Sequence, residues 1–369
     1  MIGNINFPAY AARNYFVNMF DDWYVTGFGT KITYLGNHSL KPEKTSTVDV
    51  GVDASFLRGK INLKLSYYNK TTVDMVNDVT IPSTSGFSVY KDNLGKVRNE
   101  GVEFDIYASV YQGRDFSLAL NGNIARNKNR MLEIGKSLED YNRKVEAYYD
   151  NSDKALGEQS DERKIWTKFY EGGSLTAKYG MRSLGIDPAT GQEVFLDKKG
   201  AVVFENDPKE YVVIGDTEPL GSGSLGLHAT YRNFTLTANF SYEFGSERYN
   251  ETLVYYVENA NIETENVDKR VLSQRWQNPG DKAPLKDIKE RYKQTRPTSR
   301  FMQDYNMFSL SSMSLQYELG KSSSEKLGLE RVRLEIGCGE LFQLCSVKRE
   351  RGLDYPFARS FNFNLMINF

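Results

Sequence analysis

The clearest feature of the sequence is an alternation of apolar and polar residues that recurs along most of the chain. In the first clear run, Val48, Val50 and Val52 are separated by Asp49 and Gly51. Alternation with a period of two predicts β-strands whose two faces lie in different surroundings. The runs with this pattern are 48–56, 61–67, 102–110, 116–124, 225–231, 234–242, 313–319, 332–338 and 361–369.

Two all-β architectures produce such a pattern. In a soluble β-sandwich the apolar face packs on a second sheet, whereas in a transmembrane barrel it meets lipid and the polar face lines the lumen. Counted from the first apolar position to the last, the runs extend over 7–9 residues. With their flanking residues they suit the ~9–11 residues of a tilted membrane strand better than the ~5–6 of an average strand. The connections also alternate in length. Short ones fall at 57–60, 112–115, 232–233 and 320–327, and long ones at 76–97, 131–221, 246–304 and 341–357. A barrel with short periplasmic turns and long outer loops fits this alternation.

The chain ends inside its last strand, on Phe369. If the short turns face the periplasm, counting strands places this end at the periplasmic edge, where interfacial aromatics belong. We therefore predict that Phe361, Phe363 and Phe369 serve barrel insertion and closure.

Composition changes the picture little. The 369 residues carry a formal net charge of −1, so nothing indicates a nucleic-acid partner. No stretch approaches the ~18 apolar residues of a spanning helix. The 24 Tyr and 21 Phe, beside 3 Trp, are a further feature typical of strands. The start "MIGNINFPAY" has neither the basic residues nor the apolar run of a secretory leader.

Candidate catalytic and cofactor motifs are weak. Gly221, Gly223 and Gly226 spell G-x-G-x-x-G, but a strand follows where a dinucleotide site needs a helix. His38 and His228 are the only histidines, too few for a zinc site without a Cys-x-x-Cys pair. We therefore expect no enzyme, no cofactor and no metal. The two cysteines, Cys338 and Cys345, are either small apolar fillers or a disulfide.

The long connections hold the candidate binding residues. Aromatic side chains between charged and polar neighbours can stack on sugar rings or hold peptides, although they can equally pack a loop against itself or a partner. The candidates in 131–221 are Tyr141, Tyr148, Tyr149, Trp166 and Tyr170. In 246–304, the spacing of Leu253, Tyr256 and Val257 predicts a short amphipathic helix. The basic run 126–130 lies at the outer rim and could pair with lipopolysaccharide phosphates or remain solvated.

Several segments, taken in order, resemble one family of outer-membrane proteins, the SusC-like TonB-dependent transporters. The chain departs from the family at Pro42, where a Trp usually precedes Glu-Lys, and 137–170 matches nothing in it. The resembling segments are "HSLKPEKTSTVDVGVDASFLRGKINLKLSYYNKTT" (38–72), "IPSTSGF" (81–87), "NLGKVRNEGVEFDI" (93–106), "NGNIARNKNRML" (121–132), "GIDPATGQEVFLDKKG" (185–200), "RWQNPGDKAP" (275–284) and "YPFARSFNFNLMINF" (355–369).

The resemblance implies a transmembrane antiparallel β-barrel of which this chain holds roughly the last nine of 22 strands, around a plugged lumen. Residues 1–43 would be an extracellular loop entering the barrel, 44–130 four barrel strands, 131–221 a long extracellular excursion with a small hairpin, and 222–369 five strands with a long helical loop at 246–304. The plug, the TonB box and the earlier strands are expected on another chain or a missing segment, because nine strands leave two unpaired edges.

The implied function is import of oligosaccharides or peptides across the outer membrane of a Gram-negative bacterium. The expected partners are a SusD-like surface lipoprotein, TonB, and outer-membrane lipid with lipopolysaccharide. Two alternatives stay open at this point. One is a structural barrel component of a larger outer-membrane assembly, and the other is a secreted β-sandwich module for glycan binding or adhesion.

Overall fold

The dominant element is one large antiparallel sheet. The computed structural model describes residues 12–20, 28–80, 89–149, 162–264, 266–347 and 359–369. In the sheet the strand order is β3-β4-β7-β8-β14-β15-β16-β17-β19, and the short β18 pairs with β16 beyond the end of β17. The strands are β3 (Lys44–Phe56), β4 (Ile61–Val73), β7 (Gly95–Gln112), β8 (Phe116–Ile134), β14 (Gly221–Tyr231), β15 (Phe234–Tyr249), β16 (Met302–Glu318), β17 (Arg331–Gly339), β18 (Gln343–Cys345) and β19 (Ser360–Asn368). The antiparallel sheet predicted from the alternation is thus confirmed.

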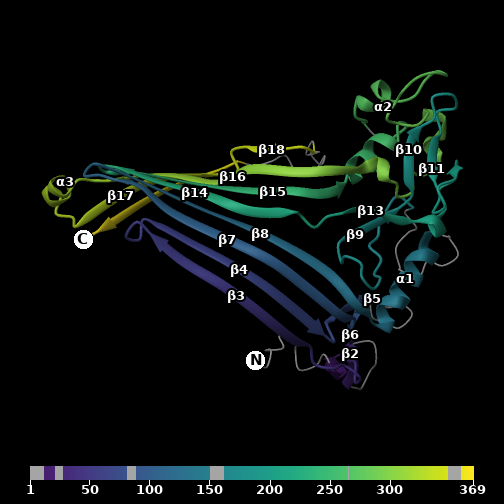
Figure 1. The fold of residues 1–369 in the computed structure, drawn as a ribbon, viewed down its shortest axis with the longest axis horizontal. Helices are drawn as coiled ribbons and strands as arrows, with labels where there is room; N and C mark the ends of the chain where they lie inside the picture. The colour runs from purple at the N-terminus through teal and green to yellow at the C-terminus, as the bar shows by residue number, and fades with distance from the viewer. Residues whose placement is uncertain (1–11, 21–27, 81–88, 150–161, 265, 348–358) are drawn as a thin grey trace.

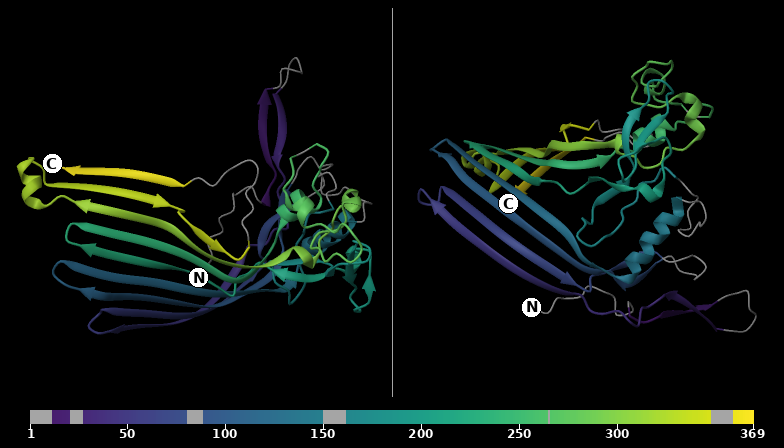
Figure 2. Two further views of the ribbon diagram at one scale, coloured as in Figure 1. Left: turned by 90° about the horizontal axis from the view of Figure 1, so that it is seen from above. Right: turned by 45° about the vertical axis from the view of Figure 1, so that its right-hand side comes forward.

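The two ends of the sheet differ, as Figures 1 and 2 show. One end carries tight connections and the short helix α3 (Lys321–Lys326), and we call it the short-turn end. The turn from β3 to β4 is made by Leu57 and Arg58 at φ of 52° and 57° and Gly59 at 85°. These positive φ values allow the four-residue loop 57–60 to reverse the chain, and the strand pairing continues without a shift as far as Phe56 and Ile61.

The other end carries the long connections, which fold into what we call the loop layer. It contains helices, 3₁₀ turns and small sheets, with β9 paired to β13 and β11 between β10 and β12. Its elements are α1 (Lys136–Tyr149), β9 (Ala177–Gly180), β10 (Arg182–Ile186), β11 (Glu193–Leu196), β12 (Val202–Val203), η3 (Pro208–Glu210), β13 (Val212–Asp216), η4 (Leu253–Glu258), α2 (Arg270–Ser273), η5 (Ile288–Tyr292) and η6 (Ser299–Phe301). Two hairpins complete the fold, β1 (Tyr15–Phe20) with β2 (Phe28–Tyr34) and β5 (Val76–Thr80) with β6 (Val89–Asn93).

Most of the buried apolar core lies in the loop layer. One cluster joins Val145 and Tyr148 of α1 to residues of β9 and β11, and a second surrounds Val254, Val257 and Phe301. A third packs Leu138 of α1 against Val97 and Met131 at the upper ends of β7 and β8. The loops are therefore a packed unit anchored on the strands.

Two local structures differ from the sequence expectation. Helix α1 has buried Leu138, Asn142, Val145 and Tyr148 at spacings of three and four, a helical stripe in a region where we predicted none. The expected amphipathic helix at 253–257 is a π-helical turn. Its wider turn buries Val254 and Val257 and leaves Tyr256 exposed.

In the described ranges, none of the helices combines the length and apolar character that a membrane crossing requires. The two cysteines are free: Cys338 lies on β17 and Cys345 on β18.

Candidate functional site: a lipid-facing wall with a polar inner face

The apolar face of the sheet is uncovered. Val50 is 62% exposed and Phe363 is 64% exposed. Three further side chains on this face are also not buried, namely Leu63, Phe104 and Leu236. In a β-sandwich all five side chains would be packed under a second sheet. Such a continuous exposed apolar surface on a folded chain marks contact with a partner or a membrane.

Aromatic side chains mark the short-turn border of this apolar face. The ladder places Phe116, Tyr231, Phe234 and Tyr317 side by side across four strands, and the rings of Phe234 and Tyr317 lie 4.8 Å apart. A second aromatic level includes Tyr242 and Phe244, whose rings stack 6.4 Å apart. From Phe234 to Phe244 the strand rises about 34 Å, or about 26 Å along the normal at ~40° tilt, which matches the ~25 Å apolar band of membrane barrels.

The predicted terminal aromatics lie on the same face. Phe361, Phe363 and Phe369 are 70%, 64% and 88% exposed. Phe361 and Phe363 stand opposite Cys338 and Ile336 of β17. The aromatic row on β8, β14, β15 and β16 was not singled out from the sequence. Its signal was an aromatic or bulky residue beside each short turn.

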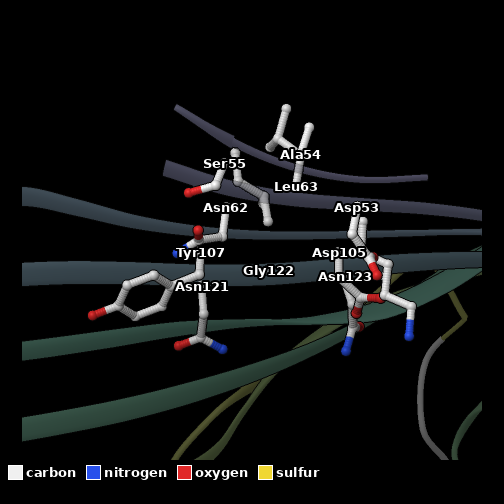
Figure 3. Close-up of a pocket in the computed structure, with 12 residues that line it drawn as sticks. Asp53, Ala54, Ser55, Asn62, Leu63, Asp105, Tyr107, Asn121, Gly122 and Asn123 are labelled. Carbon is white, nitrogen blue, oxygen red and sulfur yellow. The ribbon is translucent and has the colours of Figure 1, made fainter. Parts of the chain in front are cut away.

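The opposite face is lined with polar side chains in rows that cross the strands. In one row Asp53, Lys64 and Asp105 stand directly opposite one another, and the row continues through Asn123 to Ser224. A pocket of ≈ 480 Å³ lies on this part of the wall. Figure 3 shows the polar side chains of Asp105, Tyr107, Asn121 and Asn123 on one side of the strands and Ala54 and Leu63 on the other.

Nearer the loop layer the polar face is tied together by hydrogen bonds. The Tyr68 hydroxyl donates to Oδ1 of Asn127 (2.9 Å), and the Asn127 amide donates to Oε1 of Glu218 (2.6 Å). Glu218 also accepts from the backbone N–H of Asn129, at the level where β8 no longer has β14 beside it. The carboxylate thus satisfies a strand edge that would otherwise have an unpaired donor.

A buried ion cluster links the two long excursions. Arg300 Nη2 lies 2.8 Å from Oε2 of Glu193 on β11 and 2.6 Å from Oε1 of Glu258 at the end of η4. Thr298, fully buried, donates its hydroxyl to Glu193 (2.7 Å). Burial raises the pKa of Glu193, but Arg300 and these hydrogen bonds outweigh it and hold the pKa below its ordinary value.

The same charges act on the neighbouring cations. Burial would lower the pKa of Arg300, yet Glu193 and Glu258 raise it, so the guanidinium is firmly charged. Lys286 lies nearby, and burial lowers its pKa to about 8.

Backbone contacts add to this connection between the excursions. Trp276 Nε1 and Gly280 N both donate to the carbonyl of Pro188, at 2.9 and 2.7 Å, and Asp287 N donates to the carbonyl of Gly191 (2.9 Å). Arg296 pairs with Glu162 at 3.1 Å. The two excursions therefore form one layer rather than two independent loops.

The structure gives the predicted loop aromatics different surroundings. Tyr148 is 2% exposed and packs edge-on against Trp166, with ring centroids 5.5 Å apart. Tyr141 contacts Phe169, and burial raises the pKa of Tyr141 to about 12. Tyr170 is 44% exposed and contacts Tyr179. Tyr149 is the last residue of α1, and its side chain lies outside the described residues.

The structure places the glycine motif and the two histidines as follows. Gly221, Gly223 and Gly226 lie in β14, where Asn123 O would be 2.0 Å from a Cβ on Gly223. His228 Nδ1 is 3.2 Å from the Thr237 hydroxyl across the ladder, and His38 is exposed. Among the residues that the structure describes, no group of three or more His, Cys, Asp or Glu side chains could hold a metal ion.

Comparison with known proteins extends these observations. Residues 5–185 match the family model "TonB dependent receptor-like, beta-barrel". TonB-dependent receptor P3 of Formosa agariphila is 25% identical over 337 residues, which cover 89% of this chain and 32% of that protein. TonB-dependent receptor SusC of Bacteroides thetaiotaomicron is 27% identical over 263 residues, 70% of this chain and 24% of SusC. The chain thus spans about a third or less of the length of these relatives.

Solved structures show the same fold. The structure of the RagAB peptide transporter superposes with a TM-score of 0.70 at 19% identity, over 94% of this chain and 36% of that one. The RagAB peptide importer in its "open-open" state gives 0.67 over 100% of this chain and 38% of that one.

The uncovered apolar face, its aromatic borders and the polar inner wall define an outer-membrane β-barrel protein. Within that class, the chain is similar to the TonB-dependent receptors, whose β-barrel family model matches residues 5–185, and SusC is among its relatives.

Proposed function

We propose that this chain forms the C-terminal barrel wall and outer loops of a SusC-like importer that moves oligosaccharides or peptides across the outer membrane. The observation that carries the proposal is the combination, in one sheet, of an exposed apolar face with a polar face that leads into a packed loop layer. A sheet of this kind separates lipid from an aqueous passage. In this arrangement the loop layer faces the outside and the C-terminal Phe369 the periplasm.

The mechanism requires no covalent chemistry from these residues. The polar wall offers carboxylates, amides and hydroxyls, which can exchange hydrogen bonds with a hydrated, polar solute as it passes. The loop layer offers Tyr170, an exposed ring on a buried support, for initial contact with a sugar ring or a peptide side chain.

Two observations support the proposed substrate class. The RagAB structures are named for a peptide transporter, and the resemblance to SusC-like transporters includes oligosaccharide uptake. A SusD-like lipoprotein on the outer face and TonB acting from the periplasm, through a plug outside this chain, are the partners that we propose with it.

The test uses the complete transporter in its own bacterium. Deleting its gene should abolish uptake of either fluorescent oligopeptides or fluorescent oligosaccharides, and restoring the gene should restore the same uptake. A SusD-like lipoprotein should co-purify with the restored protein. Uptake of both solute classes at the parental rate in the deletion strain, with no such lipoprotein bound, would refute the proposal.

A further inference from the structure

Four cations lie together on the outer face of β7 and β8, directly beyond the apolar face on the loop-layer side. Arg126 stands opposite Val102, Lys128 opposite Glu100, and Arg130 opposite Arg98. The register between these strands shifts only at Lys96/Val97 and Ser109/Tyr111, so the alternation between them is unbroken. Arg98 therefore shares a face with Val102, and Arg126 shares one with Ile124, the exposed apolar side.

The cations of this group are not held in ion pairs. In the described part of the chain, no acidic side chain lies within ion-pair distance of Arg98, Arg126, Lys128 or Arg130. Across the ladder β4 presents the neutral Asn69 and Thr71. Towards β14 and β15, Arg126 and Lys128 line a hollow of ≈ 580 Å³, and the acids that line the same hollow are Asp216, Glu218, Glu247 and Asp304. Lys96 and Glu133 stand opposite each other at the next position on this face and their charges cancel. Glu100 is the remaining acid on this face of the strand pair, which leaves an excess of three positive charges.

One pair in the group is unfavourable as it stands. Arg98 and Arg130 are direct cross-strand partners, and like charges in that position repel. In addition, Nε of Arg98 is buried and has no hydrogen-bond acceptor. An anion between the two guanidinium groups would remove the repulsion and satisfy the buried donor.

We propose that this cationic patch binds the phosphate groups of lipopolysaccharide in the outer leaflet. This inference rests on the proposed function, because it needs the loop layer to be on the outside. Lipid phosphates lie immediately beyond the hydrocarbon of the membrane. The cationic patch lies in the corresponding position, because it begins directly after Val102 and Ile124 at the end of the apolar face. Cations about 5 Å apart across the ladder and about 7 Å apart along a strand give a phosphate several charged donors at once. Three arginines favour phosphate, because their planar donor fork matches its oxygens.

The experiment measures lipid A bound to the complete transporter, extracted from the outer membrane in detergent and analysed by native mass spectrometry. The wild type should retain lipid A. The variant R98Q/R126Q/K128Q/R130Q should retain at least tenfold less. A matched control replaces four cations at the short-turn end, R58Q/K60Q/K321Q/K326Q, and should retain as much as the wild type. Equal retention in all three proteins, or equal loss in both variants, would overturn the proposal.

A second measurement does not depend on how the variant folds. Wild-type transporter stripped of lipid is titrated with lipid A carrying its phosphates and with enzymatically dephosphorylated lipid A. The phosphorylated form should bind at least tenfold more tightly, and inorganic phosphate at millimolar concentration should not displace it. Equal affinity for the two forms, or displacement by free phosphate, would contradict a lipopolysaccharide site. Solute uptake, followed in parallel, reports separately on the transport function.

Discussion

At the scale of single residues, the loop layer depends on one buried arginine. Replacing Arg300 by Met removes the only cation that contacts both Glu193 and Glu258 among the described residues. Breaking a buried pair in this way leaves uncompensated charge and costs about 3–5 kcal/mol. We expect Arg300→Met to raise the opening rate of 246–304 sharply, measured by hydrogen exchange on the complete protein.

A triple variant is the control for that prediction. Arg300→Met combined with Glu193→Gln and Glu258→Gln removes the stranded charges together with the cation, so exchange should return most of the way to wild type. Exchange that is equally fast in the triple variant and in Arg300→Met would show that the substitution acts through lost packing and not through uncompensated charge.

Glu193 also predicts a pH dependence. Its pKa in the folded layer lies below the ordinary value of about 4.3, so the folded state holds fewer protons than the unfolded state around that pH. The stabilisation is complete above the ordinary value and disappears as the pH falls through the folded-state pKa. The protection of the loop layer against hydrogen exchange, taken relative to the intrinsic exchange rate at each pH, should therefore decrease as the pH falls below that ordinary value. In Glu193→Gln this decrease should be smaller, and an unchanged pH profile would contradict the assignment.

Substitutions of Tyr170 and Tyr148 should have different effects, one on uptake and the other on stability. Tyr170→Ala removes an exposed ring, so we expect severalfold slower uptake with unchanged exchange in the loop layer. Tyr148→Ala removes a ring from the core and should cost about 3–5 kcal/mol, as large-to-small core changes do. Uptake that is normal in Tyr170→Ala would remove that residue from the binding site.

Residue roles were harder to predict than residue types. The sequence indicated which aromatics stand among charges, but not that Tyr148 would be covered while Tyr170 stays exposed, because that depends on the packing of α1 against β9 and β11. The ion cluster around Arg300 could not be predicted from the sequence for a related reason. Its members are separated by up to 107 residues and form no local sequence pattern.

At the scale of elements, β19 offers a direct test of which face meets lipid. Phe363 and Asn364 are neighbours that point to opposite faces. A lipid-facing Arg costs about 2–4 kcal/mol at the bilayer midplane and less towards the interfaces, so Phe363→Arg should be destabilising, whereas Asn364→Arg should cost little. The measurement is the urea midpoint of the complete protein refolded into lipid vesicles. Equal shifts for the two variants would contradict the lipid-facing assignment.

The strands were the predictable part of the fold. The two faces of each strand lie in different media over the whole length of the strand. The alternation of apolar and polar residues can therefore be recognised from each segment alone. Helix α1 was not predicted, because its stripe has only Leu138, Val145 and Tyr148 as fully buried apolar members among many charges. The π-helical turn at Leu253–Glu258 was likewise hidden, since its geometry is set by the packing around Val254 and Phe301.

At the scale of the whole molecule, the strands have unequal lengths. β7 and β8 have 18 and 19 residues, whereas β17 and β19 have 9 each. Nineteen residues rise about 63 Å, or about 48 Å along the normal at ~40° tilt, nearly twice the ~25 Å apolar band. The β7–β8 ribbon therefore projects well past the lipid, and only its lower half is immersed.

That unequal height has a mechanical consequence. Helix α1 starts two residues after β8 ends, and Leu138 packs on Val97 and Met131 near the top of the ribbon. A force on α1 is therefore applied to the part of the β7–β8 ribbon that projects beyond the lipid, away from the part that lies in the membrane wall.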